Sequence, residues 1–407
     1  MRKLFFVISS VVLTFFIYGL LLASFSSQVF SKAGAENSHH LFYDYRGITH
    51  VVTSHSRGSL SPKDILLQAA QANIDFLFFT DLNPIDKPYS IYGYHGDIFV
   101  FSNQKVSYMD AHVLVYSDNS YFHFPSLTDA HAQLTQHFSE PQGREAPYLA
   151  VLAHPLKKNH RWQGEYPPGL DGIEVINLRS LWQHIWQTDR LNFIWSLLTY
   201  PFNPDLALLR LLDDPVKEIE LWDYLNRSHP TLGFLGNETT SRIFHIGNFN
   251  FSFPSYARSF AFASNHILLR SELTGHEQSD KEKIFQALKK GHFYFAFDTI
   301  ANPKGFATYM RTDSNTYLSG ETIPLTPDLE MSIDLPDHIA VPFEIEVYRD
   351  GVIVHKSRDS KALMKVEESG VYRIRVRIQP ELPIPDKGRW FSWIYSNPFY
   401  VVEPAID

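Results

Sequence analysis

The stretch that most constrains the fold of this chain is residues 47–83, in which a strand, a helix and a second strand follow one another closely. Ile48 to Thr53 favours a short β-strand, and polar turn residues follow it. Ser61 and Pro62 then supply the N-cap and first-turn proline of a helix. Ile74 to Phe79 is an almost unbroken apolar run, as expected of a buried parallel strand. The spacing predicts a βαβ unit with polar residues gathered at one rim.

This stretch resembles the opening of the polymerase-and-histidinol-phosphatase (PHP) superfamily of metal-dependent phosphoesterases. Those proteins begin with His-x-His-Thr, a Ser-Asp-Gly-like turn, a helix capped by Ser-Pro, and Thr-Asp-His-Asn. The same frame here reads His50-Val-Val-Thr53, Ser56-Arg-Gly58, Ser61-Pro62 and Thr80-Asp-Leu-Asn83. The resemblance implies a barrel whose rim of histidines and carboxylates holds several metal ions, which bind phosphate and activate water.

The resemblance continues toward the C-terminus. Residues 279–291, followed by the apolar run 292–298, look like the closing helix and strand of the family barrel. Residues 393–401, Trp-Ile-Tyr-Ser-Asn-Pro-Phe-Tyr-Val, resemble the ending of exported, multidomain PHP-like proteins, in which a β-sandwich follows the barrel.

Hydrophobic patterning is consistent with the same organisation. Between residues 40 and 304, apolar strand-like runs alternate with helical segments, which indicates an α/β domain. After residue 305 the period changes to two, as in Phe343–Tyr348 and Val371–Arg377. The pattern predicts an α/β barrel-like domain over 40–304 and an immunoglobulin-like β-sandwich over 305–407. The resemblance implies that the first is a distorted (β/α)7-type PHP barrel.

The N-terminal segment, residues 1–35, predicts a membrane anchor or a signal peptide. Arg2 and Lys3 precede an uncharged apolar run from Leu4 to Phe25, which is long enough to span a bilayer. The flanking charges place the N-terminus in the cytoplasm and the bulk of the chain outside, in the periplasm. The alternative is secretion after cleavage near the small residues 33–35.

Composition excludes several classes of function. The chain has 407 residues, a formal charge of −8 and no cysteine. A net negative charge argues against a surface that coats nucleic acid, so no nucleic-acid partner is expected. The absence of cysteine excludes disulfides, thiolate zinc sites, a cysteine nucleophile and a lipoprotein anchor.

Four residues match metal-ligand positions of the family. His50 matches the first histidine of the opening motif, and His112 resembles a histidine on a later strand. His154 stands in Ala-His-Pro, and Glu238 in Gly-Asn-Glu replaces the aspartate of a late motif. These residues imply one divalent ion, zinc or manganese, or none.

Other ligand positions of the family carry residues that cannot bind a metal. The list of departures is Val52, Arg57, Leu82, Lys105 and Thr240. Valine and leucine have no donor atom, and a lysine ammonium has no lone pair. His55, in the first turn, could act as a substitute ligand or be a surface or capping histidine.

Lys105 stands where the family usually has a bridging glutamate. We hypothesise that its ammonium supplies the positive charge of the missing metal and holds Asp81, Glu238 or a bound anion. Lys105, Arg57 and Asp81 are accordingly the predicted ligand-binding residues, and the ligand expected is a small anion such as a phosphate ester.

Two functions compete at this stage, and the sequence assigns no catalytic residue to either. In the first, a degraded metal centre leaves a catalytically impaired binding or structural module, that is, a pseudoenzyme. In the second, a reduced metal site still hydrolyses a phosphoester. A third interpretation is a sandwich-led adhesion or envelope-assembly protein with the barrel as a spacer.

Overall fold

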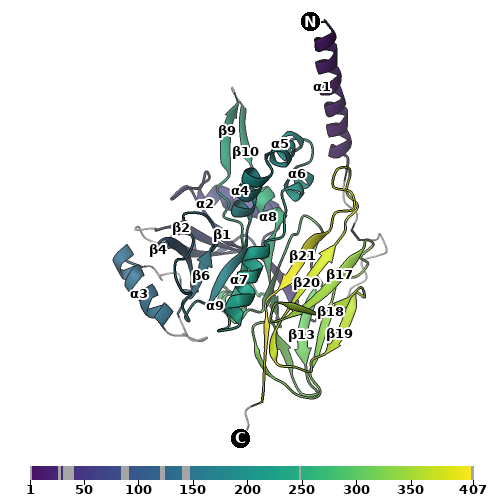
Figure 1. The fold of residues 1–407 in the computed structure, drawn as a ribbon. Coiled ribbons are helices and arrows are strands. Elements are labelled where there is room, and N and C mark those ends of the chain that lie inside the picture. The colour runs from purple at the N-terminus through teal and green to yellow at the C-terminus, as the bar shows by residue number, and fades with distance from the viewer. Residues whose placement is uncertain are drawn as a thin grey trace.

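The protein consists of an α/β part and a β-rich part packed side by side, with one helix standing out from the body (Figure 1). The computed structural model describes residues 2–25, 29–30, 41–83, 91–119, 124–139, 147–246 and 249–404. Within these ranges, side chains are described except over 242–252.

The α/β part contains the strands and helices that follow. The helices are α2 (Pro62–Gln71), α3 (Leu127–Ser139), α4 (Leu178–Thr188), α5 (Arg190–Thr199), α6 (Pro204–Arg210), α7 (Val216–Asn226), α8 (Tyr256–Phe262) and α9 (Glu277–Lys290). The strands are β1 (Tyr43–Val51), β2 (Phe76–Leu82), β3 (Gly93–His95), β4 (Ile98–Tyr108), β5 (Ala111–Tyr116), β6 (Leu149–Ala153), β7 (Gly172–Asn177), β8 (Leu232–Gly236), β9 (Arg242–Ile246), β10 (Phe249–Phe253), β11 (Ser264–Leu269) and β12 (Phe293–Ala296).

The β-rich part follows in the chain. Its strands are β13 (Ala307–Arg311), β14 (Thr316–Leu318), β15 (Thr322–Pro324), β16 (Glu330–Asp334), β17 (Phe343–Arg349), β18 (Val352–Ser357), β19 (Lys361–Lys365), β20 (Gly370–Ile378), β21 (Phe391–Ser396) and β22 (Phe399–Val402).

One large sheet runs through both parts. Its main path is β15-β22-β20-β21-β12-β11-β1-β2-β4-β5-β6-β7-β8. The strand pairs β1–β2, β2–β4, β6–β7 and β7–β8 are parallel, whereas β5 runs antiparallel to both β4 and β6. The carboxyl ends of the parallel strands and the amino end of β5 therefore meet at one rim.

The two ends of the α/β portion of this sheet approach each other. Leu235 of β8 donates its backbone N–H to the side chain of Asn265 on β11, at 3.1 Å. The Leu235 carbonyl accepts from the Asn265 amide at 2.8 Å and from the Thr49 hydroxyl of β1 at 3.2 Å. An isolated parallel bridge also joins Val51 to Thr239. These contacts bring the end of β8 beside β1, so that residues from both ends of the sheet share the rim.

The β-rich part has two sheets. The second sheet has the order β14-β13-β16-β19, and it packs on the large sheet through a buried core. Along β20 the buried residues Ile374 and Val376 alternate with arginines, as expected of a strand with one face toward a core. Strand β12 of the α/β part pairs with β21 of the β-rich part, so the large sheet crosses the boundary predicted at residue 305.

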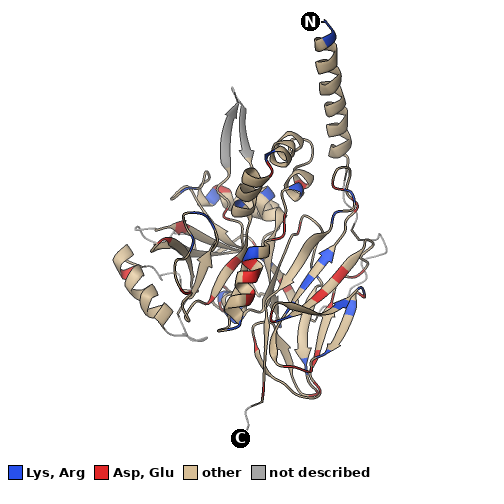
Figure 2. Cartoon of the chain, viewed as in Figure 1, with Lys and Arg blue, Asp and Glu red and all other residues tan. Residues whose placement is uncertain are grey.

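Ion pairs also join the two parts. Arg373 on β20 makes two hydrogen bonds of 2.7 Å to the carboxylate of Asp223 on α7. Arg210 on α6 contacts Asp386 at 2.7 Å. In Figure 2, α7 carries both charge signs beside the charged strands of the β-rich part.

Helix α1 (Arg2–Ala23) is apolar and mostly exposed. It is long and apolar enough to cross a membrane, as the sequence predicts, and the same features also suit a signal sequence. Among the helices in the described part of the chain, α1 is the only one that is long and apolar enough to cross a membrane.

Local sequence signals account for the elements around the rim. Ser61 caps α2, and its hydroxyl accepts from the backbone N–H of Asp64 at 3.2 Å. Gly291 closes α9 with a φ of 79°, which suits glycine at a helix C-terminus. Strand β4 continues to Tyr108 and so includes Lys105.

Candidate functional site

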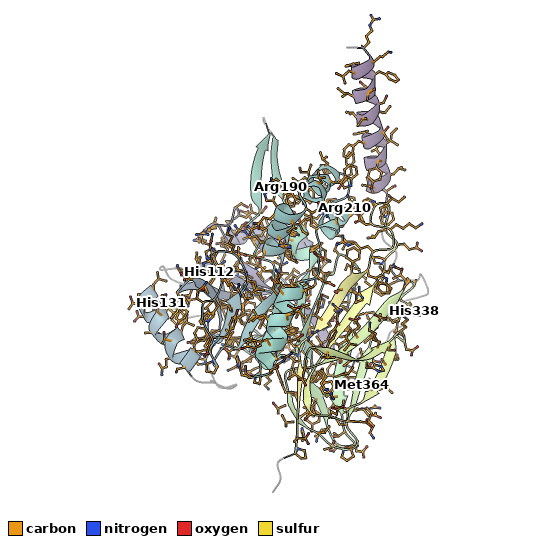
Figure 3. All side chains as sticks on the ribbon, in the orientation of Figure 1. His112, His131, Arg190, Arg210, His338 and Met364 are labelled. Carbon is orange, nitrogen blue, oxygen red and sulfur yellow. The ribbon has the colours of Figure 1, made fainter. Side chains whose placement is uncertain are left out.

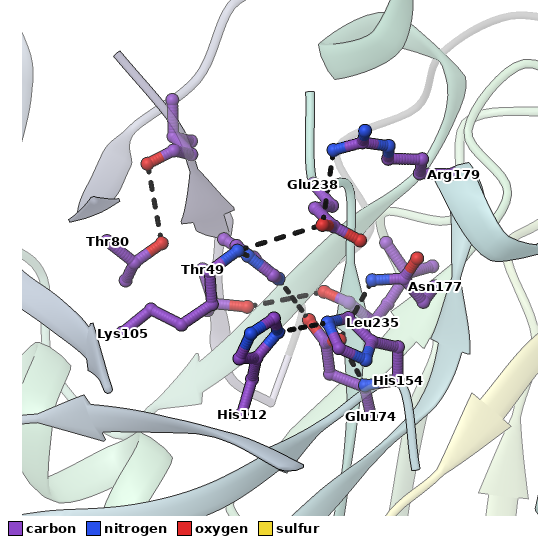
Figure 4. Close-up of polar contacts among 12 residues, drawn as sticks. Thr49, Thr80, Lys105, His112, His154, Glu174, Asn177, Arg179, Leu235 and Glu238 are labelled. Carbon is purple, nitrogen blue, oxygen red and sulfur yellow. Dashed lines mark hydrogen bonds and ion pairs between the residues drawn. The ribbon is translucent and has the colours of Figure 1, made fainter. Parts of the chain in front are cut away.

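Polar side chains that are far apart in the sequence meet at the rim of the large sheet (Figure 4). Strand pairing places them there, since β1, β2, β6, β7 and β8 all end at this edge. The predicted residues at or near this rim are His50 on β1, Asp81 on β2, Lys105 on β4, His112 on β5, His154 after β6 and Glu238 after β8.

Lys105 occupies the centre of this group. Its ammonium nitrogen lies 3.0 Å from Nε2 of His50 and 3.7 Å from Oε1 of Glu238, and all three side chains are buried. Burial lowers the pKa of Lys105, while the carboxylates of Glu238 and Glu174 oppose that shift. The sequence hypothesis named Asp81, Glu238 or a bound anion as the partner of Lys105. In the structure, Glu238 is the one of these two carboxylates that pairs with Lys105.

Glu174 is the member of the site that sequence reasoning missed. One of its oxygens accepts from Nδ1 of His50 at 2.6 Å, and the other accepts from the His154 backbone N–H and the Asn177 amide, both at 2.8 Å. Burial alone would raise its pKa, but the imidazole of His50 holds the pKa below its usual value. A glutamate inside the otherwise apolar β7 is the signal that could have identified it.

A glycine makes room for this carboxylate. A Cβ added at Gly236, on the adjacent strand β8, would overlap Oε1 of Glu174. The glycine of the Gly-Asn-Glu segment therefore has a steric role, because it allows the Glu174 side chain to cross the neighbouring strand toward His50.

His112 and His154 form a second contact at the rim. Nδ1 of His112 lies 3.1 Å from Nε2 of His154, and the ring of His160 stacks on His112 at 4.3 Å. Burial lowers the pKa of both His112 and His154 to about 3, and the positive charge of Lys105 acts in the same direction. Both imidazoles are therefore neutral at pH 7. Nδ1 of His154 has no hydrogen-bond partner among the described residues.

Glu238 is surrounded by cations. Besides Lys105, its carboxylate contacts Nζ of Lys157 at 3.1 Å and Nη1 of Arg179 at 3.3 Å. Burial would raise the pKa of Glu238, but Lys105, followed by His154 and Lys157, holds it well below the usual value. Lys157 and Arg179 were absent from the predicted site, since neither belongs to a family motif.

Two of these residues have unusual backbone conformations. The φ angle is 36° at His154 and 43° at Glu238, although neither is glycine. A positive φ costs a non-glycine residue on the order of 1–3 kcal/mol and persists only where surrounding contacts impose it. Here the Glu174 carboxylate holds the His154 backbone, and three cations hold the Glu238 side chain.

Asp81 organises the turn after β1. Its carboxylate accepts from the backbone N–H of Thr53 at 2.8 Å and the Thr53 hydroxyl at 2.7 Å, and it also accepts from Ser56. Asp81 is buried, whereas Arg57 and His55 in that turn are exposed. Asp81 therefore positions the loop that carries Arg57.

A cavity of about 650 Å³ opens over these residues. Val52 and Leu82, which replace two histidines of the family pattern, line it together with Arg57, Lys105 and His154. Further lining residues come from the segment after β6, from α4, from the α6–α7 connection and from α7. They include Lys157, Lys158, Arg179, Asp213, Asp214, Lys217 and Glu218. The lining therefore combines carboxylates with a nearly equal number of Lys and Arg side chains.

The rim does not fit a multinuclear metal centre. Across the part of the chain that the structure describes, no three His, Asp or Glu side chains are placed so that they could hold a metal ion. His50 is occupied by Glu174 and Lys105, and Glu238 is paired with three cations. A protonated lysine at this position repels a metal cation and has no lone pair to donate.

The chain was compared with protein-family models, curated proteins and solved structures. No family model and no curated protein matches the chain. Among solved structures, it is similar to a two-domain protein from Bacteroides vulgatus ATCC 8482 that contains a predicted PHP-like metal-dependent phosphoesterase. The TM-score is 0.37 and the sequence identity 12%, over 88% of this chain and 99% of that chain.

Proposed function

We propose that this chain is an exported, membrane-anchored PHP-like protein in which a lysine takes the place of the metal centre and the cavity binds a small anion. The expected ligand is a phosphate ester or a similar anionic group. In this proposal residues 40–304 form a distorted PHP barrel, residues 305–407 form an immunoglobulin-like sandwich, and α1 anchors the bulk of the chain outside the cytoplasm.

The observation that carries the proposal is the position of Lys105. Its ammonium lies between the imidazole of His50 and the carboxylate of Glu238, within a buried group of predicted metal ligands. A fixed positive charge at that point neutralises the carboxylates, as a metal ion would. An ammonium does not lower the pKa of a bound water in the way a metal does, which is why the proposal is binding rather than hydrolysis.

Basic side chains at the cavity wall support the binding of an anion. Lys157 and Arg179 each contact Glu238, and Arg57 is exposed at the cavity wall. Arginine presents several N–H donors in a fixed plane that matches phosphate oxygens. Nδ1 of His154 is a further polar atom that a ligand could satisfy.

Calorimetric titration of the full chain with inorganic phosphate tests the proposal. Because a hydrogen bond to a charged group contributes about 1.5–3 kcal/mol, Arg57→Ala and Arg179→Ala should each weaken binding about tenfold or more. Arg311→Ala is the matched control, since Arg311 pairs with Glu330 on the exposed sheet of the β-rich part. Absence of phosphate binding by the unmodified chain would reject the proposal.

The second candidate is a hydrolase with a reduced metal site. The specific observation in its favour is that His112 and His154 are neutral and direct nitrogens toward each other at 3.1 Å. Metal content distinguishes the anion-binding protein from the hydrolase. The purified protein is exposed to zinc and manganese, dialysed, and analysed by mass spectrometry. About one ion per chain, lost in His154→Ala, would favour the hydrolase and justify a phosphoesterase screen.

A further inference from the structure

Helix α5 exposes an apolar face. Leu191, Ile194 and Leu198 are spaced at i, i+3 and i+7, so they form one stripe, and their exposed fractions are 81%, 44% and 50%. Trp186 at the end of α4 adds a fourth large apolar side chain that is 44% exposed. We call these four residues the α4–α5 apolar face.

After its first residue, Arg190, helix α5 carries no charged side chain. From Leu191 to Pro204 the chain has no Asp, Glu, Lys or Arg. The charged group nearest in sequence on the α5 side is Arg190, whose guanidinium lies 5.6 Å from the ring centre of Trp186. Tryptophan and arginine side by side are characteristic of the boundary between lipid headgroups and hydrocarbon.

Helix α1 packs on α5 and on the segment that joins α5 to α6. The Phe15 ring is 5.6 Å from the Trp195 ring of α5 and 5.9 Å from the Phe202 ring that precedes α6. Near its end, the carbonyl of Leu22 accepts from the amide of Asn203 at 2.8 Å. Figure 1 shows α5 and α6 beside the C-terminal end of α1, and Figure 3 places the labelled Arg190 in this region. The last turns of α1 therefore share a packed interface with α5 and α6.

This packing fixes the depth of α5 relative to α1. The 22 residues of α1 extend about 33 Å, which is close to the roughly 30 Å of a bilayer's hydrocarbon core. Phe15 precedes Ala23 by eight residues, or about 12 Å along the axis. If α1 spans the bilayer, Trp195 beside Phe15 lies at the level of the outer leaflet, and α5 cannot be remote from the lipid.

We propose that the α4–α5 apolar face inserts into the outer leaflet of the bilayer that α1 spans. The inference rests on the membrane anchor in the proposed function and adds a second membrane contact to it. Lipid is the occupant that the structure favours. Helix α5 packs against α1 through Trp195, and it has no charged residue after Arg190. The face also presents the Trp186–Arg190 pair, which suits a membrane interface. The chain would then contact the membrane at two places, α1 and the α4–α5 apolar face.

Single-cysteine labelling of the full chain tests this inference, because the chain contains no cysteine of its own. Separate variants Ile194→Cys and Leu191→Cys report on the face, and Val11→Cys reports on α1. Val354→Cys on β18 is the matched control, since Val354 is an apolar residue 43% exposed, close to the 44% of Ile194. Each variant carries a bimane label and is reconstituted in phosphatidylcholine–phosphatidylglycerol vesicles that contain doxyl-labelled lipid.

The expected result is at least twofold quenching at positions 11, 191 and 194, with little quenching at position 354. Quenching at 11 but not at 191 or 194 would overturn the inference while leaving the anchor intact. An unquenched label at 11 would reject the anchor and the inference with it. Equal quenching at 194 and 354 would indicate non-specific adsorption and would also overturn the inference.

Discussion

The ammonium nitrogen of Lys105 lies 3.0 Å from Nε2 of His50, although 55 positions separate the two residues in the chain. The opposite nitrogen of the same imidazole contacts Glu174 at 2.6 Å. The histidine thus bridges a lysine and a glutamate in the interior of the protein. These contacts link β4, β1 and β7. They place the positive charge of Lys105 near the negative charge of Glu174 at the rim.

Removing the Lys105 charge should destabilise the fold. Lys105→Met keeps most of the side-chain stem but leaves Glu238 and Glu174 with less compensation inside the protein. Breaking a buried ion pair in this way costs about 3–5 kcal/mol, to be measured as the free energy of unfolding in urea. Lys365→Met is the control, since Lys365 is exposed and faces Glu367 at 3.8 Å. A change within about 0.5 kcal/mol of that control would contradict the role assigned to Lys105.

The close approach of Gly236 and Glu174 makes a separate prediction. Gly236→Ala introduces a Cβ where the Glu174 carboxylate now lies, so this side chain has to move away from His50. Overpacking of this kind costs about 1–3 kcal/mol in the free energy of unfolding. Urea unfolding of Gly236→Ala, Glu174→Ala and the double variant forms a mutant cycle. Strictly additive effects would show that the two sites are not coupled.

His266 should make stability depend on alkaline pH. Its ring lies 2.7 Å from Asp44 and 3.0 Å from Asp298; burial opposes protonation, but the two carboxylates raise its pKa to about 9. A raised folded-state pKa stabilises the protein fully below the unfolded value near 6.5, and this contribution is lost as pH rises through 9.

Replacing His266 by glutamine should therefore lower the free energy of unfolding by about 3 kcal/mol at pH 6. The difference from the unmodified protein should shrink between pH 6.5 and pH 9.5. Urea unfolding across that range measures it. The exposed substitution His338→Gln should produce no such trend, and a constant difference for His266→Gln would show that its protonation is not linked to folding.

Arg373 should be important for the contact between the two parts of the chain. It makes two hydrogen bonds to Asp223, and its guanidinium lies 4.0 Å from the ring centre of Tyr348. Arg373→Met leaves the Asp223 carboxylate without its partner at a largely buried site and should cost about 3–5 kcal/mol. Thermal unfolding provides the measurement. Arg358→Met is the comparison, since Arg358 follows β18 directly and its side chain is exposed. Equal melting temperatures for the two variants would contradict the prediction.

Local structure was largely predictable from the sequence. The helix after Ser61 and the glycine stop at Gly291 depend on residues within one turn of each other, so short patterns were sufficient to identify them. Helix α1 followed in the same way from an uncharged run, and the polar ends of successive strands indicated which rim would carry the site. Continuous apolar runs such as Ile74 to Phe79 likewise indicated buried strands.

The partners within the site were decided by tertiary structure. His50 and Glu174 are 124 positions apart and meet because the end of β8 comes back beside β1, which places β7 within reach of the His50 side chain. Lys157 and Arg179 reach Glu238 through the same strand order. A sequence pattern records neighbours along the chain, and so it identified the residue types at the rim. Which of them pair depends on sheet register and packing, and that in turn determined that Lys105 faces His50 and Glu238 rather than open solvent.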